Sequence, residues 1–108
     1  MRRRADFLAL RQAQGCSTKS FLAVKRPRND DDSTIRFGFT VTKKIGKAVR
    51  RNRIRRRLRE AARAVGPGHG EPGCDYVLIA RAAAADRGWS ALLDDLRRAL
   101  LSLARNPK

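Results

Sequence analysis

The chain has 108 residues, with 26 Lys and Arg residues against 10 Asp and Glu residues, and its net charge is +16. This length fits one domain, assigned to residues 1–108, and the excess positive charge favours a polyanionic partner, nucleic acid before an anionic membrane surface. No apolar run approaches the roughly 20 residues of a membrane-spanning helix, and no signal-peptide core follows the basic start, so we expect a cytoplasmic protein.

The first part of the sequence predicts a helix followed by two strands. Residues 5–13 form a short amphipathic pattern that ends before Gly15, which is typical of a helix. Residues 21–25 are apolar up to Lys25 and predict a strand, and residues 35–41 alternate strictly between apolar and small or polar side chains, which predicts a second one. The polar loop 26–34 should join these two strands as an antiparallel hairpin.

Residues 43–65 carry the most pronounced pattern of the chain. After a link at residues 43–47, Ile54, Leu58 and Val65 fall on one narrow stripe of a helical wheel, as expected of a helix that packs on a sheet. Polar and basic side chains gather on the opposite side. Eleven of the 21 residues from 43 to 63 are Lys or Arg, and one is acidic. We expect Gly66-Pro67 to end this helix.

The last part predicts a strand and a helix. The nearly continuous apolar run 75–81 is typical of a central strand covered on both faces, and Ser90 can cap a leucine-rich helix over residues 91–104. The predicted fold is therefore an α/β sandwich, with a small mixed sheet and elements in the order α-β-β-(β)-α-β-α. The strand in brackets is a short extra one near the first turn. The unit 35–81 should bring two parallel strands together.

The basic helix leaves several functions open. Its charge could be a solvated surface, but the whole chain has the same excess, which favours contact with nucleic acid. Ligands for a zinc finger are missing, and Asp30-Asp31-Asp32 on a polar loop is a weak metal site. A ribosomal RNA-binding protein, a membrane-surface helix and a protein nuclease remain as alternatives.

Residues 39–60 read FTVTKKIGKAVRRNRIRRRLRE, and this segment resembles the signature of the bacterial ribonuclease P protein. Its core is Arg51-Asn52-Arg53, and the resemblance continues through residues 4–7, residues 75–81 and the closing helix. It implies a fold similar to ribosomal protein S5 domain 2, with a left-handed crossover. It also implies the non-catalytic subunit of an endoribonuclease whose partners are the catalytic RNA and precursor tRNA, with no further protein partner required and no membrane. Mg²⁺ would be held by the RNA and substrate, with none bound by the protein alone and no catalytic residue in the chain.

The resemblance also implies two sets of binding residues. Those that would face the catalytic RNA are Lys43, Lys44, Lys47, Arg51, Asn52, Arg53, Arg56 and Arg59. Those of a cleft for the single-stranded 5′ leader are Phe7, Arg11, Phe21, Thr40 and Thr42. Core packing is the competing role of both Phe residues, and a local hydrogen bond at the helix start is the competing role of Asn52. Arg11 stands where some members of the family carry an aromatic residue.

Overall fold

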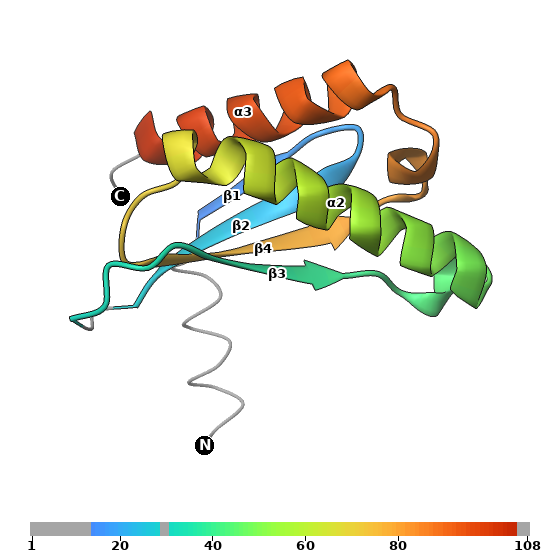
Figure 1. Ribbon diagram of the computed structural model, residues 1–108, viewed down its shortest axis with the longest axis horizontal. Coiled ribbons are helices and arrows are strands. Elements are labelled where there is room, and N and C mark those ends of the chain that lie inside the picture. The colour runs from blue at the N-terminus through green and yellow to red at the C-terminus, as the bar shows by residue number, and fades with distance from the viewer. Residues whose placement is uncertain (1–13, 29–30, 106–108) are drawn as a thin grey trace.

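The computed structural model describes residues 14–28 and 31–105, so the predicted helix 5–13 lies outside the described residues. A sheet forms one layer, and two long helices pack on the same face of it as the second layer (Figure 1). The elements are β1 (Gln14–Ser17), β2 (Phe21–Pro27), β3 (Arg36–Thr40), the 3-10 turn η1 (Lys43–Ile45), α2 (Ala48–His69), β4 (Cys74–Ala80), the 3-10 turn η2 (Ala82–Ala85) and α3 (Trp89–Arg105).

The four strands lie in the order β1-β2-β4-β3, which contradicts the predicted hairpin of β2 and β3. Strand β4 lies between them, antiparallel to β2 with Phe21 opposite Ala80, and parallel to β3 with Phe37 opposite Tyr76. The apolar run of β4 gains most from a central position, whereas β3 alternates with small and polar residues and tolerates the edge. The parallel pair and the extra short strand, β1, are confirmed.

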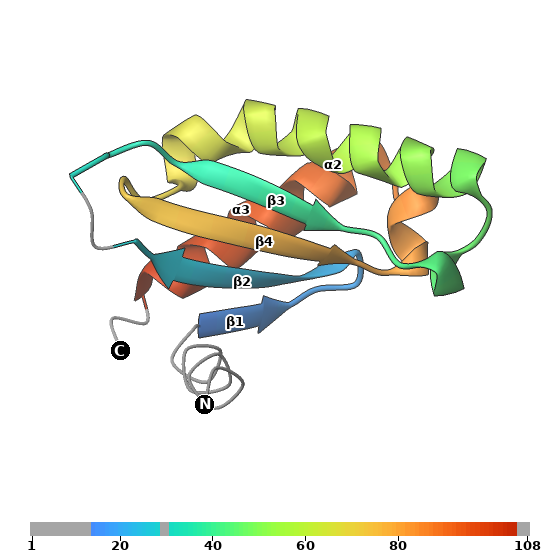
Figure 2. The ribbon, with the colours of Figure 1, turned by 90° about the horizontal axis from the view of Figure 1, so that it is seen from below.

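The connection from β3 through α2 to β4 is left-handed. When the sheet is viewed from the helix side with both strands pointing upward, β4 lies to the left of β3 (Figures 1 and 2). Parallel strand-helix-strand units are right-handed in about 98% of cases. The rare hand that the family resemblance implied is therefore confirmed.

Only one face of the sheet is covered by described residues. Along β4, Cys74, Tyr76, Leu78 and Ala80 are buried, but the residues between them are only half-buried. Figure 2, seen from below, shows the strands in front of α3, with α2 along the edge of the sheet at β3. The prediction that this strand is covered on both faces is therefore wrong for the described part of the chain, because α2 and α3 pack side by side on the same face.

Helix α2 continues through Gly66 and Pro67 to His69, so the predicted stop is wrong. Pro67 is exposed and loses one helical hydrogen bond, but the amide N–H of Gly70 donates to the carbonyl of Gly66 at 2.7 Å and closes the helix. Gly66 is buried against Phe37: a Cβ at this position would lie 2.7 Å from Cε2 of that ring. This close packing favours the extra turn despite the proline.

Helix α3 begins at Trp89, before Ser90, so Ser90 is not its cap. The amide of Leu92 donates to the carbonyl of Gly88 at 2.8 Å and forms the first turn. The predicted apolar face is confirmed, since Leu92, Leu96, Leu100 and Leu103 are buried and Leu93 is partly buried.

Two glycines in the last turns of α2 test this packing. We expect Gly66→Ala to lower the free energy of unfolding by about 1–3 kcal/mol, because the added methyl group overlaps the ring of Phe37. Gly68→Ala is the matched control, since its Cβ position has no atom within 4 Å apart from its chain neighbours and the helix backbone, and alanine favours a helix. Urea unfolding followed by circular dichroism measures both, and equal stabilities would contradict the tight contact at Gly66.

Candidate nucleic-acid interface

Helix α2 has one buried edge and one exposed edge. Ile54, Leu58, Ala61, Ala62 and Val65 are buried against the sheet and α3. The opposite edge, which holds Asn52, Arg56, Arg59 and Arg63, is exposed. The wheel drawn from the sequence is confirmed, and the sheet presents the basic edge outward.

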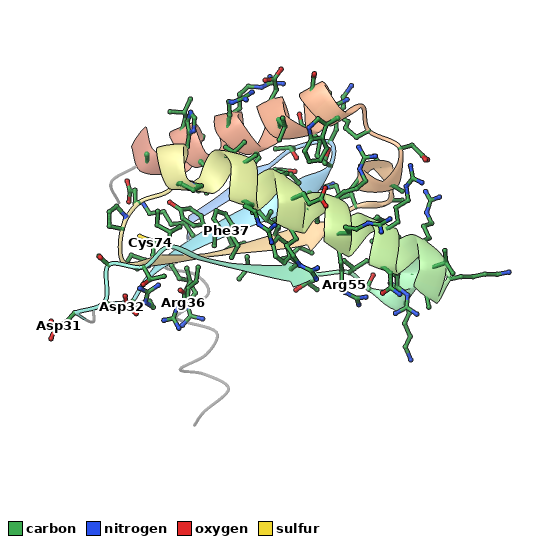
Figure 3. All side chains as sticks on the ribbon, in the orientation of Figure 1. Asp31, Asp32, Arg36, Phe37, Arg55 and Cys74 are labelled. Carbon is green, nitrogen blue, oxygen red and sulfur yellow. The ribbon has the colours of Figure 1, made fainter. Side chains whose placement is uncertain are left out.

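All of the residues predicted to bind the catalytic RNA lie on η1, on the residue before α2 or in the first twelve residues of α2. Seven are exposed and Arg51 is half-buried. They therefore form one surface, named here the α2 surface, which consists of Lys43, Lys44, Lys47, Arg51, Asn52, Arg53, Arg56 and Arg59. Figure 3 shows basic side chains projecting around the amino end of α2, and Asp31 and Asp32 at the other end of the molecule.

Some arginines of α2 stabilise the fold through contacts within the protein. Arg50 lies 3.6 Å from the carboxylate of Asp86, and Nε of Arg53 donates to the carbonyl of Ala85 at 3.2 Å. Arg57 donates to the carbonyls of Ala85 and Arg87. These side chains hold the connection between β4 and α3 against the helix. Sequence patterns could not indicate this role, because it depends on a segment about 30 residues away.

Other cations of the α2 surface have no partner in the described part of the chain. No carboxylate and no hydrogen-bond acceptor among residues 14–28 and 31–105 pairs with Lys43, Lys44, Lys47, Arg56 or Arg59. Glu60, the one acid of α2, also forms no ion pair there. The surface therefore carries uncompensated positive charge, which favours a polyanion.

Asn52 forms a local hydrogen bond near the start of α2, as in its competing role, and the partner is a side chain. Its Oδ1 accepts a hydrogen bond from Nη1 of Arg55 at 3.0 Å, which positions that guanidinium beside the α2 surface. Arg55 (Figure 3) and Val49 were not predicted as site residues, yet both line an open hollow there together with Asn52, Arg53, Arg56 and Arg59. Val49 is 82% exposed, so its apolar side chain is open to solvent among these cations.

The structure places the residues predicted for the leader cleft in different surroundings. Phe7 and Arg11 lie outside the described residues. Phe21 is fully buried on the helix-covered face, so it packs the core and cannot stack on a base in this structure. Thr40 and Thr42 are exposed, and Thr40 lies opposite Ile79 in the sheet.

Comparisons with known proteins agree with this geometry. A family model described as ribonuclease P matches residues 1–104. The ribonuclease P protein component of Caulobacter vibrioides (strain NA1000 / CB15N) is 54% identical over 104 residues, which cover 96% of this chain and 70% of that protein. The ribonuclease P protein component of Ruegeria pomeroyi is 50% identical over 105 residues, which cover 95% of this chain and 84% of that protein. The chain belongs to the ribonuclease P protein family.

A solved structure supports the same assignment. The ribonuclease P protein from Thermotoga maritima matches with a TM-score of 0.73 at 26% identity, over 94% of each chain. The resemblance seen in the sequence is therefore confirmed. The chain is a protein subunit of the ribonucleoprotein endoribonuclease P, which processes the 5′ end of tRNA, and this function implies association with the ribonuclease P RNA and a tRNA substrate.

The described residues offer no metal site and no membrane span. Within 14–28 and 31–105, no three His, Cys, Asp or Glu side chains gather so that they could hold a metal ion. Asp32 accepts hydrogen bonds from the hydroxyl of Thr34 at 2.5 Å and from its amide at 2.9 Å, which lower the pKa of this carboxyl. No helix among these residues is long and apolar enough to cross a membrane.

Two neighbouring arginines separate the two roles of α2. We expect Arg56→Ala to weaken RNA binding and to make the negative slope of log affinity against log salt shallower by about 0.7–0.9, the loss of one phosphate contact. Its melting temperature should stay near that of the wild type, because Arg56 is exposed and has no partner in the described chain.

Arg57→Ala should instead lower the free energy of unfolding by about 1–2 kcal/mol, because it removes the hydrogen bonds to the connection before α3. Filter binding over a salt series and thermal melting measure both variants. A large loss of stability in Arg56→Ala would mean that this residue is structural.

Proposed function

We propose that the α2 surface binds the phosphodiester backbone of the ribonuclease P catalytic RNA. The observation that carries this proposal is the set of exposed cations without carboxylate partners in the described chain, on a helix whose other edge is buried. Each neutralised phosphate releases condensed counterions, so six contacts would give a salt slope of about −4 to −5. Binding should therefore depend steeply on salt.

Specific contacts would add to this general attraction. Arg guanidinium groups can bind phosphate in a bidentate manner, and the amide of Asn52 can donate as well as accept. The bond from Arg55 occupies one lone pair of Asn52 Oδ1 and leaves its amide hydrogens available to RNA. Val49 lies beside these groups and offers apolar contact to a ribose or a base face.

We infer that the open face of the sheet takes part in holding the 5′ leader of precursor tRNA as a single strand. Leu22 and Ile79 are half-buried and face each other across β2 and β4, and Thr40 follows in the same row on β3. Such a row offers apolar contact beside a hydroxyl, which suits a chain of unpaired nucleotides. This face is also free of α2 and α3, as Figure 2 illustrates.

We further propose that the partner RNA and the substrate hold the Mg²⁺ ions of the reaction, because the described residues do not form a site for a metal ion. The contribution of the protein would be to neutralise phosphates and to orient the leader. This role requires no further protein partner and fits a protein of the cytoplasm.

Cleavage of precursor tRNA tests the main proposal. A bacterial ribonuclease P RNA with a leader-bearing precursor tRNA at low Mg²⁺ should cleave faster when the protein is added, by at least about tenfold, or about 1.4 kcal/mol of barrier. The protein alone should not cleave. Unchanged kinetics of the RNA would contradict the proposal.

A charge added to the open face tests leader binding. We expect Thr40→Glu to weaken holoenzyme binding of a leader-bearing precursor by about fivefold, as about 1 kcal/mol of repulsion at contact distance predicts. The affinity of the variant holoenzyme for mature tRNA, which has no leader, should not change. Ser102→Glu, on the exposed side of α3, adds the same charge away from this face and is the control. Equal effects of the two variants would refute a leader path over Thr40.

A further inference from the structure

A second cationic pocket lies beside α3, apart from the α2 surface. It is open, has a volume of about 710 Å³, and is formed by β1 and the turn that follows it, the segment after β4, and α3. Its lining residues are Cys16, Ser17, Thr18, Lys19, Arg81, Arg87, Asp95 and Arg98. None of them was predicted to bind RNA.

The charges of this pocket do not balance. Four of the lining residues are cations and one, Asp95, is an acid. The carboxylate of Asp95 is 3% exposed and accepts two hydrogen bonds from Arg87, at 2.9 and 3.0 Å, and one from the hydroxyl of Ser20 at 2.6 Å. Burial acts to raise the pKa of Asp95, but these hydrogen bonds outweigh it and lower the pKa. Asp95 therefore stays charged and its charge is matched by Arg87.

The other three cations face the pocket with little compensation. Arg81 donates to the hydroxyl of Ser17 at 2.6 Å, and Arg98 approaches Asp95 only to 3.7 Å. Lys19 has no ion pair or hydrogen bond from its ammonium group within the described residues. Like charges from three separate elements are thus held together, which costs stability unless an anion neutralises them.

The backbone that carries these cations is fixed in place. The amide of Arg81 donates to the carbonyl of Ser20 at 2.9 Å, and the hydroxyl of Thr18 accepts from the amides of Ser20 and Phe21 at 3.2 and 3.1 Å. Ser20 in turn is buried and bonded to α3 through Asp95. The turn after β1, the end of β4 and α3 are therefore joined into one preorganised arrangement.

The pocket lies at the same end of the molecule as the α2 surface. Both views show the turn between β1 and β2, η2 and the amino ends of α2 and α3 gathered at this end (Figures 1 and 2). The segment between the two cationic regions is the one that Arg53 and Arg57 bind from α2. A polyanion that contacts the amino end of α2 can therefore continue into the pocket.

We propose that this pocket is a second phosphate-binding subsite, which takes the phosphodiester backbone of RNA through Lys19, Arg81 and Arg98. Guanidinium, ammonium and hydroxyl groups match phosphate oxygens, and no aromatic side chain lines the pocket to stack on a base. The inference rests on the proposed function, because the RNA must also engage the α2 surface. The backbone could belong to the catalytic RNA or to precursor tRNA.

Single substitutions on α3 and the β1–β2 turn test the subsite. Arg98→Ala and Lys19→Ala should each make the negative salt slope of RNA binding shallower by about 0.7–0.9, the loss of one phosphate contact. Arg97→Ala is the matched control. Arg97 directly precedes Arg98 in α3, lies outside the pocket and pairs with Asp94 at 2.8 Å. Arg98→Lys keeps the charge and should keep most of the slope. Thermal melting verifies that each variant is folded.

Two arms identify the source of the phosphate. A reduced slope in binding of the catalytic RNA alone assigns the subsite to that RNA, and a reduced slope only in binding of precursor tRNA by the holoenzyme assigns it to the substrate. If Lys19→Ala and Arg98→Ala match Arg97→Ala in both arms while Arg56→Ala weakens binding, the subsite is refuted and the proposed function stands. If Arg56→Ala has no effect either, the proposed function fails.

Discussion

The burial of one narrow edge of α2 is the constraint on which the rest of the molecule depends. Like charges three and four residues apart repel each other, so a helix this basic would be unfavourable in isolation. Ile54, Leu58 and Val65 are nearly or fully removed from water, and each large apolar side chain contributes about 1.5–3 kcal/mol. This burial offsets the repulsion and keeps the charged edge in place before any RNA is present.

The arginines of α2 divide into two groups because the helix lies beside the segment that joins β4 to α3. Those on the near side, Arg50, Arg53 and Arg57, donate to backbone carbonyls or pair with Asp86. Those on the far side, such as Arg56 and Arg59, have no partner in the described chain. The same residue type therefore serves the fold on one side and presents free charge on the other.

The placement of both helices on one face of the sheet shapes the surfaces proposed for RNA. It leaves the row of Leu22, Ile79 and Thr40 free of α2 and α3, and it brings the amino ends of these helices to one end of the sheet. Charge from α2, from the turn after β1 and from α3 is consequently concentrated there. A buried acid, Asp95, holds Arg87 and Ser20 and links this end to the core.

The sequence alone determined the periodic features: the strand predicted at 21–25, the alternation over 35–41, the two faces of α2, the leucine face of α3 and the family. These depend on side chains close together along the chain. Tertiary structure decided that β4 separates β2 from β3, that α2 runs past Pro67 and that Phe21 is in the core. It also decided which arginines are bound and that Lys19 and Arg98 line the same pocket. Each of these outcomes depends on contacts between distant segments, where packing outweighs local preference.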